Sequence, residues 1–112
     1  MKKFYDFNTP WGTTERVYLK KHEYLIDKTL AVSAVCENEE PWTMVTVNVG
    51  EEPLNEKCAF VKDYSENEGM TDFLVKNNIA KPTGRAKVLP SGFDPFIIMI
   101  PEFEFDLSKL SK

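Results

Sequence analysis

The chain has 112 residues, enough for one compact domain and too few for two ordinary ones. Hydrophobic residues make up 42% and charged residues 29%, which excludes a disordered chain and a membrane-embedded one. Its 18 acidic residues outnumber its 14 Lys and Arg residues, which excludes a nucleic-acid-binding protein that relies on bulk positive charge.

The first half of the chain is expected to form strands, because apolar residues recur there with a period of two. The segments with this pattern are residues 4–8, 16–24, 30–36 and 42–49. Residues 30–36 are also rich in alanine, so a short helix is the alternative for that segment. The last two segments flank a polar turn, and we expect them to pair as an antiparallel hairpin.

The second half is expected to contain a further strand at residues 58–61 and one helix. Met70, Phe73 and Leu74 recur at helical spacing, and acidic residues crowd the start of that segment. We therefore expect the main helix at about residues 68–78. Residues 81–84 and 90–92 contain Pro and Gly and are expected to be loops.

The C-terminal part is expected to form a buried strand at residues 96–100 and then a segment with one exposed face. In the latter, apolar residues alternate strictly with acidic ones, as in an edge strand or a one-sided sheet. The apolar residues are Phe103, Phe105 and Leu107, and the acidic ones are Glu102, Glu104 and Asp106.

These segments predict an α+β fold, a mostly antiparallel sheet with one main helix packed on it, in a single domain of residues 1–112. The longest apolar run, residues 96–100, is far shorter than a membrane span, and the basic start lacks the apolar core of a signal peptide. We therefore expect a cytoplasmic protein with no membrane partner.

We expect no catalytic residue, no metal site and no cofactor. His22 is the only histidine, and it lies in a polar stretch without a nucleophile signature. Cys36 and Cys58 lie among apolar residues, which is typical of inert buried thiols, and the two cannot complete a zinc site. The segment that starts at Asp63 resembles a calcium loop, but position 12 is Leu74 instead of a glutamate.

Two sets of residues are candidates for binding. Lys81, Arg85 and Lys87 lie beside a glycine and could hold a phosphate or a carboxylate, the alternative being a solvated loop. A surface for a protein partner could combine exposed aromatic and acidic side chains, the alternative being an acidic face that blocks edge-to-edge pairing. Its residues are Trp11, Trp42, Glu102, Glu104 and Asp106.

Several strings in the chain, in this order, resemble an uncharacterised family of small proteins. They are EPWTMVTVNV at 40–49, AFVKD at 59–63, FLVKNNIAKPTG at 73–84 and SGF at 91–93. The similarity covers about residues 14–103, and the chain departs from the family pattern after Asp63 and after Phe93. The resemblance implies an origin in gut bacteria, their phages and conjugative elements, and a domain of unknown function without assigned catalytic residues.

The sequence therefore predicts a small, non-enzymatic accessory protein that binds a protein partner, with counter-defence as one purpose. The alternative is a small-ligand or nucleic-acid binding module that uses the basic residues at 81–87. In the first case we expect no nucleic acid partner, and either a monomer or a homodimer.

Overall fold

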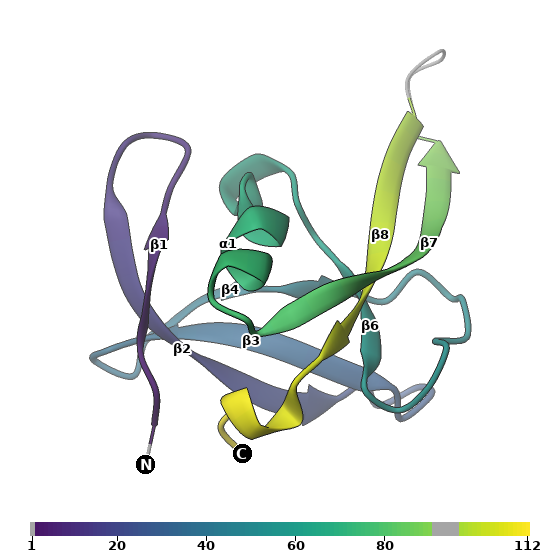
Figure 1. Ribbon diagram of the computed structural model, residues 1–112, viewed down its shortest axis with the longest axis horizontal. Helices are drawn as coiled ribbons and strands as arrows, with labels where there is room; N and C mark the ends of the chain where they lie inside the picture. Colours follow the sequence, from purple (N-terminus) through teal and green to yellow (C-terminus); the bar gives the residue numbers. More distant parts are fainter. Residues whose placement is uncertain (1, 91–96) are drawn as a thin grey trace.

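The computed structural model describes residues 2–90 and 97–112, and the fold is α+β. The strands form two antiparallel sheets of four strands each, instead of the one sheet expected (Figure 1). The first sheet has the order β1 (Tyr5–Asn8), β2 (Thr14–Glu23), β3 (Leu30–Cys36), β4 (Pro41–Met44). The second sheet has the order β5 (Thr46–Val47), β6 (Cys58–Val61), β8 (Ile97–Phe105), β7 (Ala80–Pro90).

β3 is a strand and not the alternative helix, because side chains on both of its faces are buried. Leu30, Val32 and Ala34 belong to the main core, while Ala31 and Val35 are buried on the opposite face of the sheet. A strand with neighbours on both sides and cover on both faces can be apolar throughout. The expected antiparallel pairing of this segment with the one that follows is also confirmed.

The segment expected as one strand at 42–49 is divided between the two sheets at Val45. The Val45 N–H donates to the Val32 carbonyl in the first sheet, at 2.8 Å, and the Val45 carbonyl accepts from the Lys62 N–H beside the second, at 2.9 Å. Val45 is fully buried. The apolar pattern continues through Val45 because its side chain faces the core, although the chain passes there from β4 of the first sheet to β5 of the second.

The α-helix α1 (Met70–Lys76) lies within the expected range and is shorter than it. Gly69, which precedes the helix, has φ 95°, a left-handed conformation that suits glycine and interrupts a helix. Asp63 accepts hydrogen bonds from the N–H groups of Gly69 and Thr71, at 2.8 and 2.9 Å, and so caps the helix start. Asp63, the first residue of the calcium-like segment, therefore has a structural role.

β7 contradicts one expectation from the sequence, and β8 decides between two alternatives. Residues 81–84 are part of β7 and not a loop. The pairing with β8 shifts register between Pro82 and Ala86, and Gly84 has φ 91° there. This irregularity accommodates Pro82 and Gly84 in an outer strand. β8 lies between β6 and β7, which excludes an edge strand, one of the two alternatives for the alternating segment. The expected strand at 96–100 corresponds to the start of β8, apart from Phe96, which lies outside the described residues.

The core lies between one face of the first sheet, α1 and the second sheet. Phe7 on β1 contacts both Phe73 of α1 and Trp42 of β4, each with ring centroids 5.2 Å apart. After the short 3₁₀ helix η2 (Leu107–Lys109), Ser111 forms backbone hydrogen bonds with Leu19 and Lys21, along the part of β2 that β1 leaves free. Among the described residues, no helix is long and apolar enough to cross a membrane.

Candidate functional site

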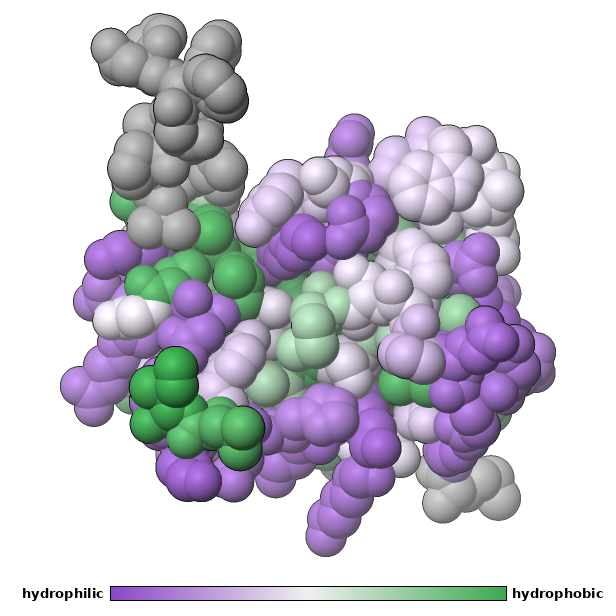
Figure 2. All heavy atoms as spheres, turned by 180° about the vertical axis from the view of Figure 1, so that it is seen from behind, coloured by the Kyte–Doolittle hydropathy of each residue, from purple (hydrophilic) through white to green (hydrophobic). Residues whose placement is uncertain are grey.

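The turn between β2 and β3 presents two large aliphatic side chains to solvent. Leu25 is 88% exposed and Ile26 is 94% exposed, although both are strongly hydrophobic residues. Figure 2 shows a hydrophobic group at the end of the molecule where this turn lies, at the lower left. Single exposed apolar residues are ordinary, but neighbouring ones beside a hollow are typical of interaction surfaces.

The turn has a fixed geometry. The Tyr24 N–H donates to the Thr29 carbonyl at 2.9 Å, and the Lys28 N–H donates to the Tyr24 carbonyl at 2.8 Å. Asp27 accepts hydrogen bonds from the N–H and hydroxyl groups of Thr29 and from the Asn48 side chain. These bonds hold Leu25 and Ile26 at the tip, where they cannot fold back onto the core.

A cavity of about 820 Å³ lies beside these residues, and we call it the turn cavity. Ala31, a small residue of β3, borders it, and Met44 of β4, 40% exposed, adds an apolar side chain. The residues that line it are His22, Glu23, Tyr24, Leu25, Ile26, Asp27, Ala31, Met44, Asn48 and Gly50. The cavity thus combines exposed apolar side chains with a polar rim.

The rim of the turn cavity is acidic. Glu23 and Asp27 belong to it, and its described lining residues include no Lys or Arg. Hydrogen bonds from Thr29, and in smaller part from Asn48, hold the pKa of Asp27 below its usual value. Asp27 therefore keeps its negative charge at neutral pH.

His22, also on the rim, forms a hydrogen bond with Ser33, with 2.8 Å between Nε2 and Oγ. A histidine beside a serine can act in acyl transfer when an acid orients the ring and N–H donors stabilise an oxyanion. Ser33 lies within β3, which is paired on both sides, so the ladders occupy the backbone groups around it. The described hydrogen bonds of the His22 ring include none to an acidic side chain. The pair fits a role in joining β2 and β3.

The three candidate anion ligands lie along β7, and each faces a carboxylate. Nitrogen–oxygen distances are 3.7 Å for Lys81 with Glu104, 3.5 Å for Arg85 with Glu102 and 3.0 Å for Lys87 with Glu51. An anion would have to compete with these carboxylates for the cations. The cavity next to Lys81 is lined by no Trp or Tyr among the described residues, in contrast to the aromatic lining that a nucleotide site would favour.

The expected aromatic and acidic partner surface does not form one patch. Glu102 is fully buried, which contradicts its expected place on an exposed face. It accepts hydrogen bonds from the Thr83 hydroxyl at 2.7 Å and the Leu54 N–H at 2.9 Å, and Arg85 balances its charge. A carboxylate with three such partners can be buried although the sequence pattern indicates exposure.

The other members of that surface have separate environments. Trp11 is 61% exposed in the turn between β1 and β2, while Trp42 is half-buried against Phe7. Glu104 pairs with Lys81, and Asp106 accepts hydrogen bonds from Ser108 at the start of η2. Of the set, Trp11 is the large apolar side chain that is exposed.

The cysteines are free, Cys58 buried and Cys36 partly so. Burial raises the pKa of both thiols, and nearby carboxylates add to this effect. Neither thiol is activated as a nucleophile by this environment. No group of three or more potential metal ligands occurs among the described residues.

The sequence analysis missed Leu25, Ile26 and Met44. Leu25 and Ile26 are two apolar residues in a turn, which adds nothing to a strand or helix period. The available signal was their position between Tyr24 and the turn residue Asp27, where apolar side chains have no strand face to occupy.

Comparison with known proteins identifies the family. Residues 18–112 match a domain of unknown function, DUF4313. The chain belongs to this family. The match begins within β2, at Tyr18, and includes all the residues that line the turn cavity. It confirms the expected resemblance to a domain of unknown function. Neither a curated protein nor a solved structure matches the chain significantly.

Proposed function

We propose that this DUF4313 protein is a binding module that holds a partner protein at the turn cavity. The observation that carries the proposal is the exposure of Leu25 and Ile26 on a hydrogen-bonded turn. Met44 of β4 borders the same cavity. Full burial of a Leu or Ile side chain contributes about 1.5–3 kcal/mol, so covering these two gives a substantial part of an interface. Part of this gain is offset by the cost of association.

The rim indicates the chemistry of the partner. Glu23 and Asp27 carry negative charge at the edge of an apolar cavity. A partner that places an apolar side chain in the cavity and a Lys or Arg beside it would satisfy both features. The proposal is therefore a protein partner with a basic, apolar contact segment.

The contact is tested by a double substitution of Leu25→Ser and Ile26→Ser. Affinity capture from the cells that express the protein should recover a partner with the wild type, and the double variant should retain at least tenfold less of it. Val75→Ser is the control, because Val75 is an apolar residue on α1 that is 49% exposed and does not line the cavity. It should retain the partner as the wild type does.

Two results would overturn the proposal. One is that the wild type recovers no partner above background. The other is that the double variant, with unchanged melting temperature, binds the partner as tightly as the Val75 control.

A further inference from the structure

The second sheet carries buried side chains on its outer face, the face turned away from the main core. Side chains alternate between the two faces of a strand, and in β6 Ala59 and Val61 belong to the main core. Cys58 and Phe60 therefore lie on the outer face, yet both are buried. Glu102 of β8, which pairs with Phe60 in the ladder, is buried on the same face. Another segment has to cover this face, because an uncovered sheet face is in contact with solvent.

The chain between β5 and β6, residues 48–56, lies over this outer face, and we call this segment the strap. The Leu54 N–H donates to the buried Glu102 carboxylate at 2.9 Å. The Cys58 thiol donates to the side-chain oxygen of Asn55 at 3.4 Å. Figure 1 shows the segment on the side of β6 that faces away from α1. The strap thus shields buried polar groups of the second sheet from water.

The strap contributes little to the packing of the protein. The structure describes all of its residues, and none of them is buried, with Leu54 58% exposed. Within the described part of the chain, its one backbone–backbone hydrogen bond is local, from the Cys58 N–H to the Asn55 carbonyl. Segments with few buried apolar contacts are those that open most readily in a native protein.

Polar side chains of other elements hold the strap in place. Lys87 of β7 contacts Glu51 at 3.0 Å, and this pair is partly exposed. Arg85, also on β7, donates to the Glu52 carbonyl at 3.1 Å. The bond to Glu102 is the strongest of these contacts, because its acceptor is a fully buried carboxylate.

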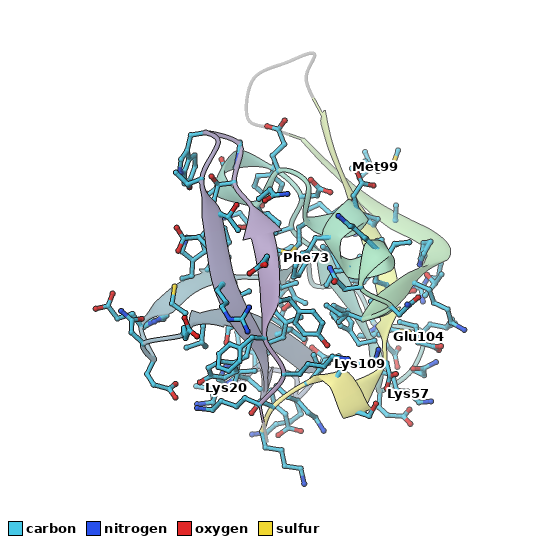
Figure 3. The ribbon with its side chains drawn as sticks, turned by 60° about the vertical axis from the view of Figure 1, so that its left-hand side comes forward. Lys20, Lys57, Phe73, Met99, Glu104 and Lys109 are labelled. Carbon is cyan, nitrogen blue, oxygen red and sulfur yellow. The ribbon has the colours of Figure 1, made fainter. Side chains whose placement is uncertain are left out.

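We propose that the strap opens as a unit while both sheets stay folded, and that the hydrogen bond from Leu54 to Glu102 controls how often it opens. The ends of the strap are fixed, since β5 pairs with β6 before it and Lys57 lies beside Glu104 of β8 after it (Figure 3). Opening breaks polar contacts and no ladder of either sheet. In the open state, water and small reagents reach the Cys58 thiol.

The strap also begins at the turn cavity. Asn48 and Gly50 line that cavity, and the Asn48 side chain donates to Asp27 on its rim at 3.2 Å. A partner that fills the cavity therefore favours the closed strap, because the cavity is complete only with these residues in place. This link between opening and binding rests on the proposed function.

The first experiment measures opening by the reaction of Cys58 with N-ethylmaleimide. It uses the Cys36→Ser protein, in which Cys58 is the one remaining cysteine. Labelling should depend little on low concentrations of urea, because opening of the strap exposes little surface. Labelling with the urea dependence of global unfolding would overturn the proposal, since Cys58 would then be reached only in the unfolded chain.

A pair of proline variants, made in the Cys36→Ser protein, tests the hydrogen bond to Glu102. Leu54→Pro removes the N–H that donates to this carboxylate. Glu56→Pro is the matched control, because Glu56 is the second residue of a turn closed by a hydrogen bond between Asn55 and Cys58, where proline is favoured. Leu54→Pro should label at least tenfold faster than the Cys36→Ser protein, and Glu56→Pro within twofold of it. Equal rates for the two proline variants would overturn the proposal.

A pair of lysine variants decides the question if the melting temperature shows that Leu54→Pro does not fold. Lys87→Met removes the contact with Glu51 on the strap. Lys81→Met, on the same strand, removes a contact with Glu104 of β8 instead. Lys87→Met should label about two- to fivefold faster, as expected of an exposed pair, and Lys81→Met at the unchanged rate. Equal rates for the two lysine variants would overturn the proposal.

The link to the turn cavity is tested with the partner that the wild type captures. A saturating amount of this partner should slow the labelling of Cys58 at least threefold. Unchanged labelling would overturn the link, while the urea dependence and the paired variants decide the opening itself. If no partner is captured, the link fails together with the proposed function, and the opening of the strap is still decided by the labelling rates.

Discussion

Two tyrosine hydroxyls in this protein have opposite environments. The Tyr5 hydroxyl is buried without a hydrogen-bond partner among the described residues, and burial raises its pKa. The Tyr24 hydroxyl shares a hydrogen bond of 2.9 Å with Thr46, which in turn accepts from the Val32 N–H. A buried polar group without a partner costs free energy, whereas a paired one contributes it.

Substitution of each tyrosine by phenylalanine should therefore have different effects on the free energy of unfolding. Tyr5→Phe should leave it unchanged or raise it by up to about 1 kcal/mol, because an unpaired group is removed. Tyr24→Phe should lower it by about 1 kcal/mol, because Thr46 loses a partner. Urea unfolding of the two variants measures both. A loss with Tyr5→Phe as large as that with Tyr24→Phe would contradict the environment described for Tyr5.

At the scale of elements, Glu102 fastens three segments together. From β8 it binds Thr83 and Arg85 of β7 and the Leu54 N–H of the loop between β5 and β6. Arg85 also donates to the Glu52 carbonyl in that loop, at 3.1 Å. Glu104 lies two residues farther along the same face of β8, and its side chain is 29% exposed where that of Glu102 is fully buried. Its partner Lys81 is largely exposed.

Glu102→Gln should lower the free energy of unfolding by about 2–3 kcal/mol, because it removes a buried charge that several partners require. Glu104→Gln, the matched control, should cost less than about 1 kcal/mol, because Glu104 is partly exposed and its lysine partner lies in solvent. Urea unfolding again provides the measurement. Equal costs for the two variants would show that burial does not distinguish these carboxylates.

The helix and most of the strands could be predicted from the sequence, whereas some of their neighbours could not. Alternation predicted most strands and helical spacing predicted α1, because each reports a buried face directly. The same pattern was misleading at Glu102, where the three partners that permit burial come from β7 and a distant loop. Pro82 and Gly84 indicated a loop, because the bulge that accommodates them depends on the register with β8.

The candidate site was less predictable than the fold. Exposure of Leu25 and Ile26 depends on the turn bonds of Asp27 and on the position of Asn48, which follows β5. The pairing of Lys81, Arg85 and Lys87 with carboxylates depends on contacts across β7, β8 and the loop at 51–52. Tertiary neighbours of this kind leave no period or motif in the sequence.

For the whole molecule, carboxylates determine the response to acid. Six of them have a pKa below the usual value, the largest cause in each being a hydrogen bond from a neighbouring side chain. They are Asp27, Glu39, Glu51, Glu66, Glu104 and Asp106. A lowered pKa means that the folded protein binds protons less readily than the unfolded chain.

The stability that these groups contribute should be fully present above their unfolded pKa of about 4 and be lost as the pH falls through the lower folded values. The urea midpoint should therefore change little from pH 7 to pH 5 and decrease below about pH 4. A midpoint that rises between pH 4 and pH 3 would contradict this assignment.

Val45 lies at the boundary between the sheets and bonds to Val32 of β3 and to Lys62, the residue directly after β6. The N–H and the carbonyl belong to the same residue, and its backbone cannot rotate freely because its side chain is fully buried. Opening either sheet at this position displaces a residue on which the other relies. The two sheets are thus thermodynamically coupled, and a half-melted intermediate that keeps one sheet intact should not accumulate on the way to the denatured state.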